Sequence, residues 1–232
     1  MIISGFRAKA LLVALVTLTG GSAFGYWSYI GYQQREQREL RDEVAALVQD
    51  TAVRLRAGLA SQPGGINPDN PEALRSLYDH AVMVDGHLKK FRNLDVSSLA
   101  HFGDAADDYL LTSREILLRR ASTQRYRLKI ADDLRSLRKH MRTDDATGAW
   151  ITAAVRAKER VDEVYRDYRM ASTALRELLQ SLPAAQAKIA PHVDAALLID
   201  DSLVNDTRQR VMVVTQNTER ELDRYANLNR YR

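Results

Sequence analysis

The stretch WITAAVRAKERVDEVYRDYRMASTALRELLQSL, residues 150–182, decides the fold class. Its apolar residues recur at alternating spacings of four and three for more than four heptads, which places them on one face of a helix. Such a stripe is typical of coiled-coil-like packing. Its members are Trp150, Ala154, Ala157, Val161, Val164, Tyr168, Ala171, Leu175, Leu178 and Leu182. We therefore predict a long helix that packs along a narrow apolar seam.

Similar patterns occupy most of the remaining chain. They predict helices over residues 33–62, 71–92, 97–142 and 184–228, in addition to the central one. The fold class that follows is all-α: a single N-terminal transmembrane helix, continued into an elongated antiparallel bundle of about five long helices with coiled-coil-like packing. A solenoid of tetratricopeptide type is a weaker alternative, because no motif recurs at a period of 20 to 50 residues.

Proline and glycine mark the expected helix boundaries. Breaker dipeptides at residues 63–68 separate the first two helices, and Pro71 suits the first turn of the second helix. Pro183 should end the central helix or begin the next one, with Ser181 as its N-cap. Pro191 should bend the last helix.

Composition excludes several functional classes. The 232 residues include no cysteine, which excludes a disulfide scaffold, a thiolate metal site and a cysteine nucleophile. Of the net charge of +4, Arg7 and Lys9 contribute +2, and the remaining chain has 32 basic against 30 acidic residues. Because a general phosphate-binding surface needs a sustained positive excess, we expect no nucleic-acid partner.

The N-terminus predicts a membrane anchor. Residues 10–34 carry no formal charge, and as a helix they extend about 37 Å, enough to cross a bilayer. Arg7 and Lys9 precede this stretch, and an aromatic cluster follows it. We predict a cytoplasmic tail (1–9), a transmembrane helix (10–32) and a periplasmic or external bundle (33–232), in a single-pass inner-membrane protein with its N-terminus inside.

A cleaved signal peptide is the alternative, because small residues at 21–23 permit cleavage after Ala23. The apolar character continues through Phe24, Trp27 and Ile30, which favours an uncleaved signal-anchor. Gly21 and Gly25 form a G-x-x-x-G pattern, so we consider a transmembrane dimer contact and a homodimer.

The most unusual local feature is basic. Residues 114–142 contain ten basic and three acidic side chains, and Arg120, Thr123 and Arg127 stand where the seam calls for apolar residues. Because the arginine fork suits carboxylate or phosphate, Arg119, Arg120, Arg125 and Arg127 are candidates for binding an anion or an acidic partner. In one alternative the seam shifts to Leu117, Ala121 and Leu128 and leaves the arginines in water. In another they pair internally with Asp194, Asp200, Asp201 and Asp206.

Histidine and aspartate residues offer weaker candidates. Metal ligands could come from His80, His87, Asp79, Asp85, His101, Asp104 and Asp108, and haem ligands from His87, His101, His140 or His192. No recognised metal motif connects these residues, so we expect solvated helix faces and assign no metal or cofactor.

In outline the chain resembles the membrane-tethered helical ectodomains of bacterial chemoreceptors and sensor kinases, without a shared motif. We expect a non-enzymatic protein that acts as an interaction or accessory (scaffold) component of a cell-envelope complex, with the bilayer and other envelope proteins as partners. The alternative is a ligand-sensing ectodomain that signals through a separate transducer, since the expected cytoplasmic tail is too short for an output module. A metal- or haem-binding bundle or an enzyme is the third reading.

Overall fold

The computed structural model describes residues 4–60, 71–141 and 149–226, and gives side chains for residues 31–60, 72–141 and 149–226. Within these ranges the chain is entirely helical, with no strand, which confirms the predicted helical bundle. The elements are α1 (Ser4–Ala60), α2 (Pro71–Arg92), η1 (Ser97–Leu99), α3 (His101–Met141), α4 (Ala149–Ile189), η2 (Ala195–Leu197) and α5 (Asp201–Asp223).

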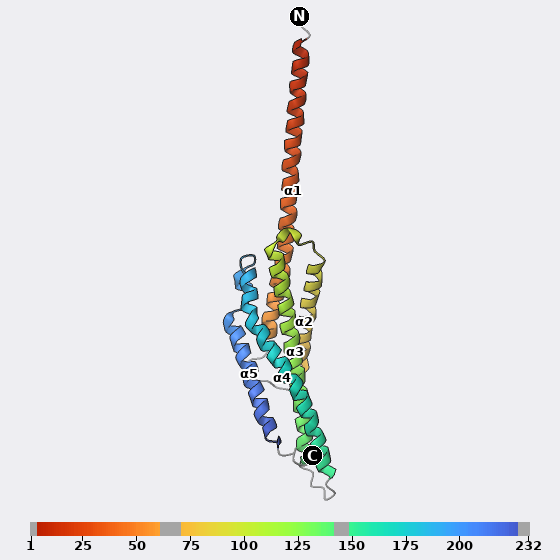
Figure 1. The fold of residues 1–232 in the computed structure, drawn as a ribbon, viewed down its shortest axis with the longest axis vertical. Helices are drawn as coiled ribbons and strands as arrows, with labels where there is room; N and C mark the ends of the chain where they lie inside the picture. The colour runs from red at the N-terminus through yellow and green to blue at the C-terminus, as the bar shows by residue number, and fades with distance from the viewer. Residues whose placement is uncertain (1–3, 61–70, 142–148, 227–232) are drawn as a thin grey trace.

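Successive helices run in opposite directions in an elongated assembly (Figure 1). The pair α3 and α4 makes the most extensive contact, and α1 and α2 pack against α3 in one half of the bundle. The helix α5 packs mainly on α4 and makes little direct contact with α3. The first part of α1 extends beyond the other helices (Figure 1).

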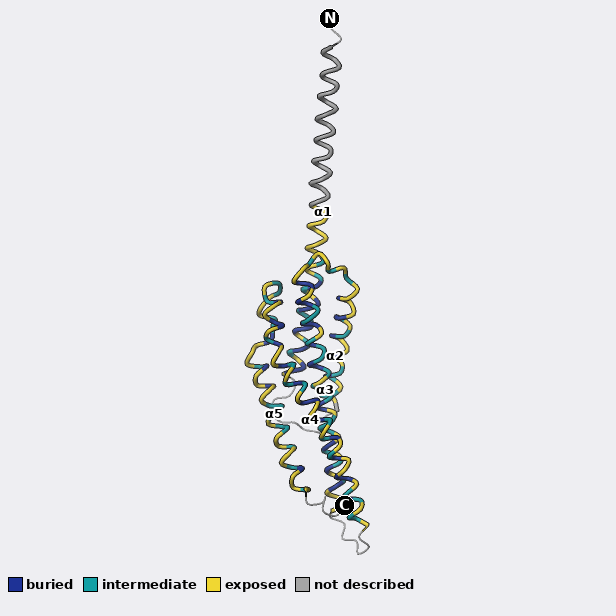
Figure 2. The backbone as a smooth tube through the Cα atoms, in the orientation of Figure 1, coloured by how far each residue is buried: buried dark blue, intermediate teal, exposed yellow. Residues whose placement is uncertain are grey.

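The core consists of two apolar clusters. The larger joins α1, α2, the first half of α3 and the second half of α4, and includes the fully buried Leu55, Tyr109 and Leu175. The smaller lies where α3 and α4 continue beyond α1, and includes Leu137, Val161 and Tyr168. Buried backbone positions accordingly follow the centre of the bundle (Figure 2).

The second half of α1 is built into the larger cluster. Its buried side chains recur at helical spacing along residues 44–59, because Val44, Val48 and Leu55 share one apolar face. Gly58 permits a close approach to α3: a Cβ added there would lie 2.3 Å from the Cδ2 atom of Leu117. The end of α1 therefore lies close against α3.

The predicted helix boundary at Pro183 and its N-cap are wrong. The helix α4 continues through Pro183 to Ile189, because Ala185, Gln186 and Ile189 extend its buried face. Ser181 does not act as an N-cap, since its hydroxyl donates to the carbonyl of Leu178 within the helix.

The predicted start of the third helix and the predicted bend also need correction. Residues 97–99 form the separate 3-10 helix η1, and Ala100, with φ of 44°, breaks the chain before α3 begins. Pro191 does not bend a continuous helix, because it lies in the non-helical connection between α4 and η2.

The apolar seam of α4 largely matches the pattern. Ala154, Val161 and Leu175 are buried, but Leu178 is only partly buried and the adjacent Leu179 is fully buried in its place. The seam shifts there because this part of α4 also packs against the connection at residues 190–200.

Side chains of residues 10–30 lie outside the described set, which includes most of the predicted span and the glycine pair Gly21 and Gly25. Among the described residues, no helix contains a stretch long and apolar enough to cross a membrane.

Candidate functional site

The basic segment of α3 divides into an outer and an inner set. Arg119 and Arg125 are exposed, whereas Arg120 and Arg127 are partly buried on the side that faces the bundle. Arg120 and Arg127 share one face because seven residues make almost two helical turns. The structure thus separates the four arginines that the sequence singled out into two pairs.

The inner pair lines a cavity of about 320 Å³ between α3 and α5. The helix α4 contributes Tyr168 and Leu175 to its wall, and α2 contributes Leu77. The remaining lining residues are Thr123, Gln124, Gln209, Arg210, Val211, Val213, Val214 and Asn217. The cavity exists because α3 and α5 both pack on α4 and have little contact with one another.

Arg120 connects the cavity to the end of α1. Its guanidinium Nη2 donates to the carbonyl oxygen of Leu59 at 3.3 Å, close to the C-terminus of α1. A cation is favourable there because the helix dipole leaves partial negative charge on the last carbonyl groups. Burial, and secondarily the charge of Arg210, lowers the pKa of Arg120 to about 10.

Arg127 has a different environment. It forms no hydrogen bond or ion pair with any other residue that the structure describes, and burial lowers the pKa of its guanidinium. One helical turn before it, Gln124 is 6% exposed, and its amide Nε2 has no hydrogen-bond partner among the described residues. Two sets of nitrogen donors in this cavity are therefore available to a bound group.

Internal pairing of the basic segment with the acidic stretch is one alternative from the sequence. In the structure, three of the four aspartates of that stretch have partners outside α3. Asp194 accepts a hydrogen bond from the backbone of Ala196 at the start of η2, and Asp200 caps α5 by accepting from Ser202. Asp206 forms an ion pair with Arg210 on its own helix.

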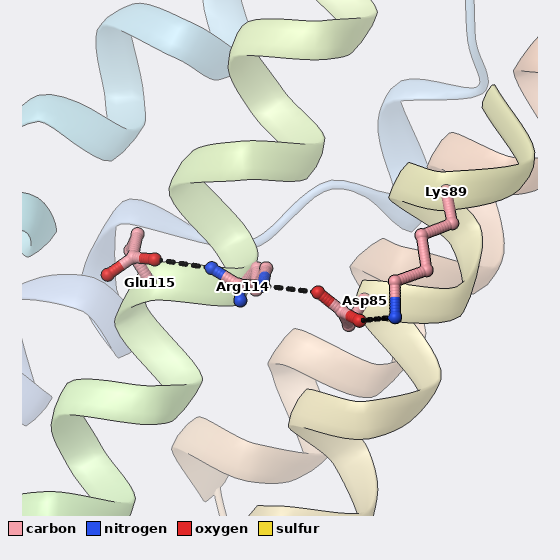
Figure 3. Close-up of polar contacts among 4 residues, drawn as sticks. All are labelled: Asp85, Lys89, Arg114 and Glu115. Carbon is pink, nitrogen blue, oxygen red and sulfur yellow. Dashed lines mark hydrogen bonds and ion pairs between the residues drawn. The ribbon is translucent and has the colours of Figure 1, made fainter. Parts of the chain in front are cut away.

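Other bases of α3 lie in ion pairs. Arg114 donates to Asp85 at 2.6 Å and to Glu115 at 2.7 Å, and Asp85 also accepts from Lys89 at 2.7 Å (Figure 3). The hydrogen bonds from Lys89 and Arg114 lower the pKa of Asp85. This cluster joins α2 to α3 and supports the bundle. Beyond the cavity, Arg138 pairs with Glu221 and joins α3 to α5.

Several of the candidate metal and haem ligands contact other side chains. His87 contacts the Thr51 hydroxyl at 2.9 Å and the Asp50 carboxylate at 3.0 Å, and Asp108 pairs with Lys188. His192 contacts Arg41 and packs against the ring of Phe102. Within residues 31–60, 72–141 and 149–226, no three histidine, aspartate or glutamate side chains are grouped so that they could hold a metal ion.

Several residues that line the cavity were not predicted as site residues from the sequence. Arg210 and Asn217 come from α5, and Tyr168 counted there only as a seam residue. Gln124 gave a weak signal, because a polar residue that lies next to the disrupted positions 120, 123 and 127 belongs to the same interrupted stripe.

No protein-family model matches this chain, and neither a curated protein nor a solved structure shows significant similarity to it.

Proposed function

We propose that this chain is a membrane-anchored extracytoplasmic helical bundle that acts by interaction, as an accessory component of a cell-envelope complex. The observation that carries the proposal is the continuity of α1, which is one helix from Ser4 to Ala60. Its first part contains the uncharged stretch 10–34, and its last part is buried in the core through Val44, Val48 and Leu55. An anchor built this way fixes the bundle directly to the bilayer, without a flexible linker.

The topology is tested by cysteine labelling, for which the chain is well suited because it has no native cysteine. Val82→Cys places a thiol on α2 at a position that is 69% exposed, and Ser4→Cys places one before the predicted span. A membrane-impermeant maleimide should label the first variant in spheroplasts and the second only after lysis. Labelling of both variants before lysis, or of neither, contradicts the proposed topology.

Retention of the anchor is tested by sequencing the mature N-terminus. A chain that begins at Phe24 would show cleavage and refute the anchor.

The interaction is tested by purifying the intact chain in mild detergent from its native membrane. A stoichiometric membrane-protein partner is expected, and recovery of the chain alone contradicts an accessory role.

A ligand-sensing ectodomain with a separate transducer is the second candidate function. One specific observation favours it: the cavity that Arg120, Arg127 and Arg210 line. Copurification of a signal transducer would support sensing, whereas a structural assembly would support the accessory role.

A further inference from the structure

The cavity between α3 and α5 carries an imbalance of charge. Arg120, Arg127 and Arg210 line it, and none of the described lining residues is acidic. Arg210 has Asp206 as a partner, and Arg120 donates to the Leu59 carbonyl. Arg127 has no such contact within the described ranges. A partly buried cation is costly without an opposite charge, so an anion bound at Arg127 would stabilise this arrangement.

The nearby acidic residues Glu221 and Asp206 do not pair with Arg127. Glu221 lines a second hollow that shares Arg127, but its carboxylate pairs with Arg138. Asp206 is exposed and bound to Arg210.

Apart from the arginines, the wall is mainly apolar, and its uncharged polar residues are Thr123, Gln124, Gln209 and Asn217. Leu77, Leu175 and Tyr168 are buried, Val211 and Val214 are partly buried, and Val213 is exposed at the rim. The volume of about 320 Å³ is at the lower end of the range of small-molecule sites. A wall of this kind suits a compact apolar group, because burying such a group removes its surface from water.

We propose that this cavity binds a small organic carboxylate with a compact apolar body. The carboxylate lies against the guanidinium of Arg127, with the amide nitrogen of Gln124 as a further donor, and the body lies against the side chains of α4 and α5. Inorganic phosphate matches only the charge, since it has no apolar surface for Leu175 and Val214. A neutral analogue of the same shape matches only the apolar wall.

This inference goes beyond the proposed function and does not depend on the anchor. Failed topology labelling would leave the binding site intact, and failed ligand binding would leave the anchor intact.

The test is calorimetric titration of the full chain in mild detergent with benzoate, benzamide, acetate and inorganic phosphate. Benzoate should bind with one-to-one stoichiometry. Benzamide lacks the charge, and acetate and phosphate lack the ring, so each should bind at least about tenfold more weakly.

Two variants probe the two halves of the site. Arg127→Gln should weaken benzoate binding by roughly tenfold to a hundredfold, because a charge-assisted contact is lost. Arg125→Gln is the matched control: it removes the same charge from an exposed position of the same helix and should change affinity less than about twofold. Val214→Phe fills the apolar side of the cavity and keeps every arginine, and it should abolish benzoate binding. Circular dichroism verifies that each variant is folded.

Four results would overturn the proposal: no heat with benzoate, equal affinity for benzamide, tighter binding of phosphate than of benzoate, or equal losses in R125Q and R127Q. If R127Q does not fold, V214F still decides, because unchanged benzoate affinity in that variant places the ligand outside this cavity.

Discussion

Replacing Gln186 by methionine should destabilise the connection between α4 and α5. Gln186 is 6% exposed, and its side-chain amide pairs with both backbone groups of Ile199. Its Nε2 donates to the Ile199 carbonyl at 2.9 Å, and its Oε1 accepts from the Ile199 N–H at 2.8 Å. Ile199 itself is 3% exposed, so water has little access to these groups.

The magnitude follows from these two hydrogen bonds. Each buried backbone group that loses its partner costs about 1 to 3 kcal/mol. Methionine has a similar volume and gains some apolar burial, which offsets part of the loss. We expect a decrease in the free energy of unfolding of about 2 to 5 kcal/mol, and a decrease in Tm of roughly 5 to 15 °C for a chain of this length.

Thermal melts of the full chain, followed by circular dichroism, measure the effect. Gln180→Met is the matched control, because Gln180 is exposed on the same helix and its replacement should change stability by less than about 0.5 kcal/mol. Hydrogen exchange adds a local measurement, since the amide of Ile199 should lose protection in Q186M. Equal melts for the two variants, with unchanged protection at Ile199, would refute the reasoning.

Three further predictions concern packing and pH. Leu179→Ala should cost about 2 to 5 kcal/mol and Leu178→Ala clearly less, because only Leu179 is fully buried; equal losses in denaturant titrations would contradict the shifted seam. Gly86→Ala should stabilise α2 by up to about 1 kcal/mol, because an added Cβ there has no neighbour within 4 Å. Gly58→Ala should gain no stability or lose some, because an added Cβ meets Leu117 of α3. Thermal melts that show equal gains for the two variants would exclude that contact. Burial lowers the pKa of His87, so its imidazole binds a proton more readily in the unfolded chain than in the folded one. The free energy of unfolding should therefore fall as the pH drops through about 6.5. This fall, measured between pH 7.5 and 5, should be shallower in His87→Asn, and parallel curves of stability against pH for the two proteins would contradict the role of His87.

The helical bundle could be predicted from the sequence because the alternation of three and four is a local property of each segment. The extent of α4 could not. Proline in a helix interior removes a hydrogen bond and crowds the preceding turn, so Pro183 predicts a boundary. In the folded chain, burial of Gln186 and Ile189 beyond the proline outweighs that local cost.

The candidate cavity was predictable only on one side. Arg120 and Arg127 interrupt an apolar stripe, which any pattern analysis of α3 detects. Which residues of α5 face them depends on how the connection at 190–200 directs that helix. Contacts between distant segments set this direction: Gln186 holds Ile199, and Arg56 of α1 donates to the carbonyls of Ala196 and Leu198. A local sequence pattern contains no information on such long-range contacts. The position of Arg210 and Asn217 in the cavity wall could therefore be found only from the structure.

The length of α1 has a mechanical consequence. The helix has 57 residues, and its part from Val44 to Leu59 is packed in the core. The 40 residues before Val44 form an arm about 60 Å long. If this arm moves as a rigid rod, a tilt of one degree where it leaves the bundle displaces its far end by about 1 Å. Small rearrangements of the core around Val44 are thus amplified at the opposite end of α1.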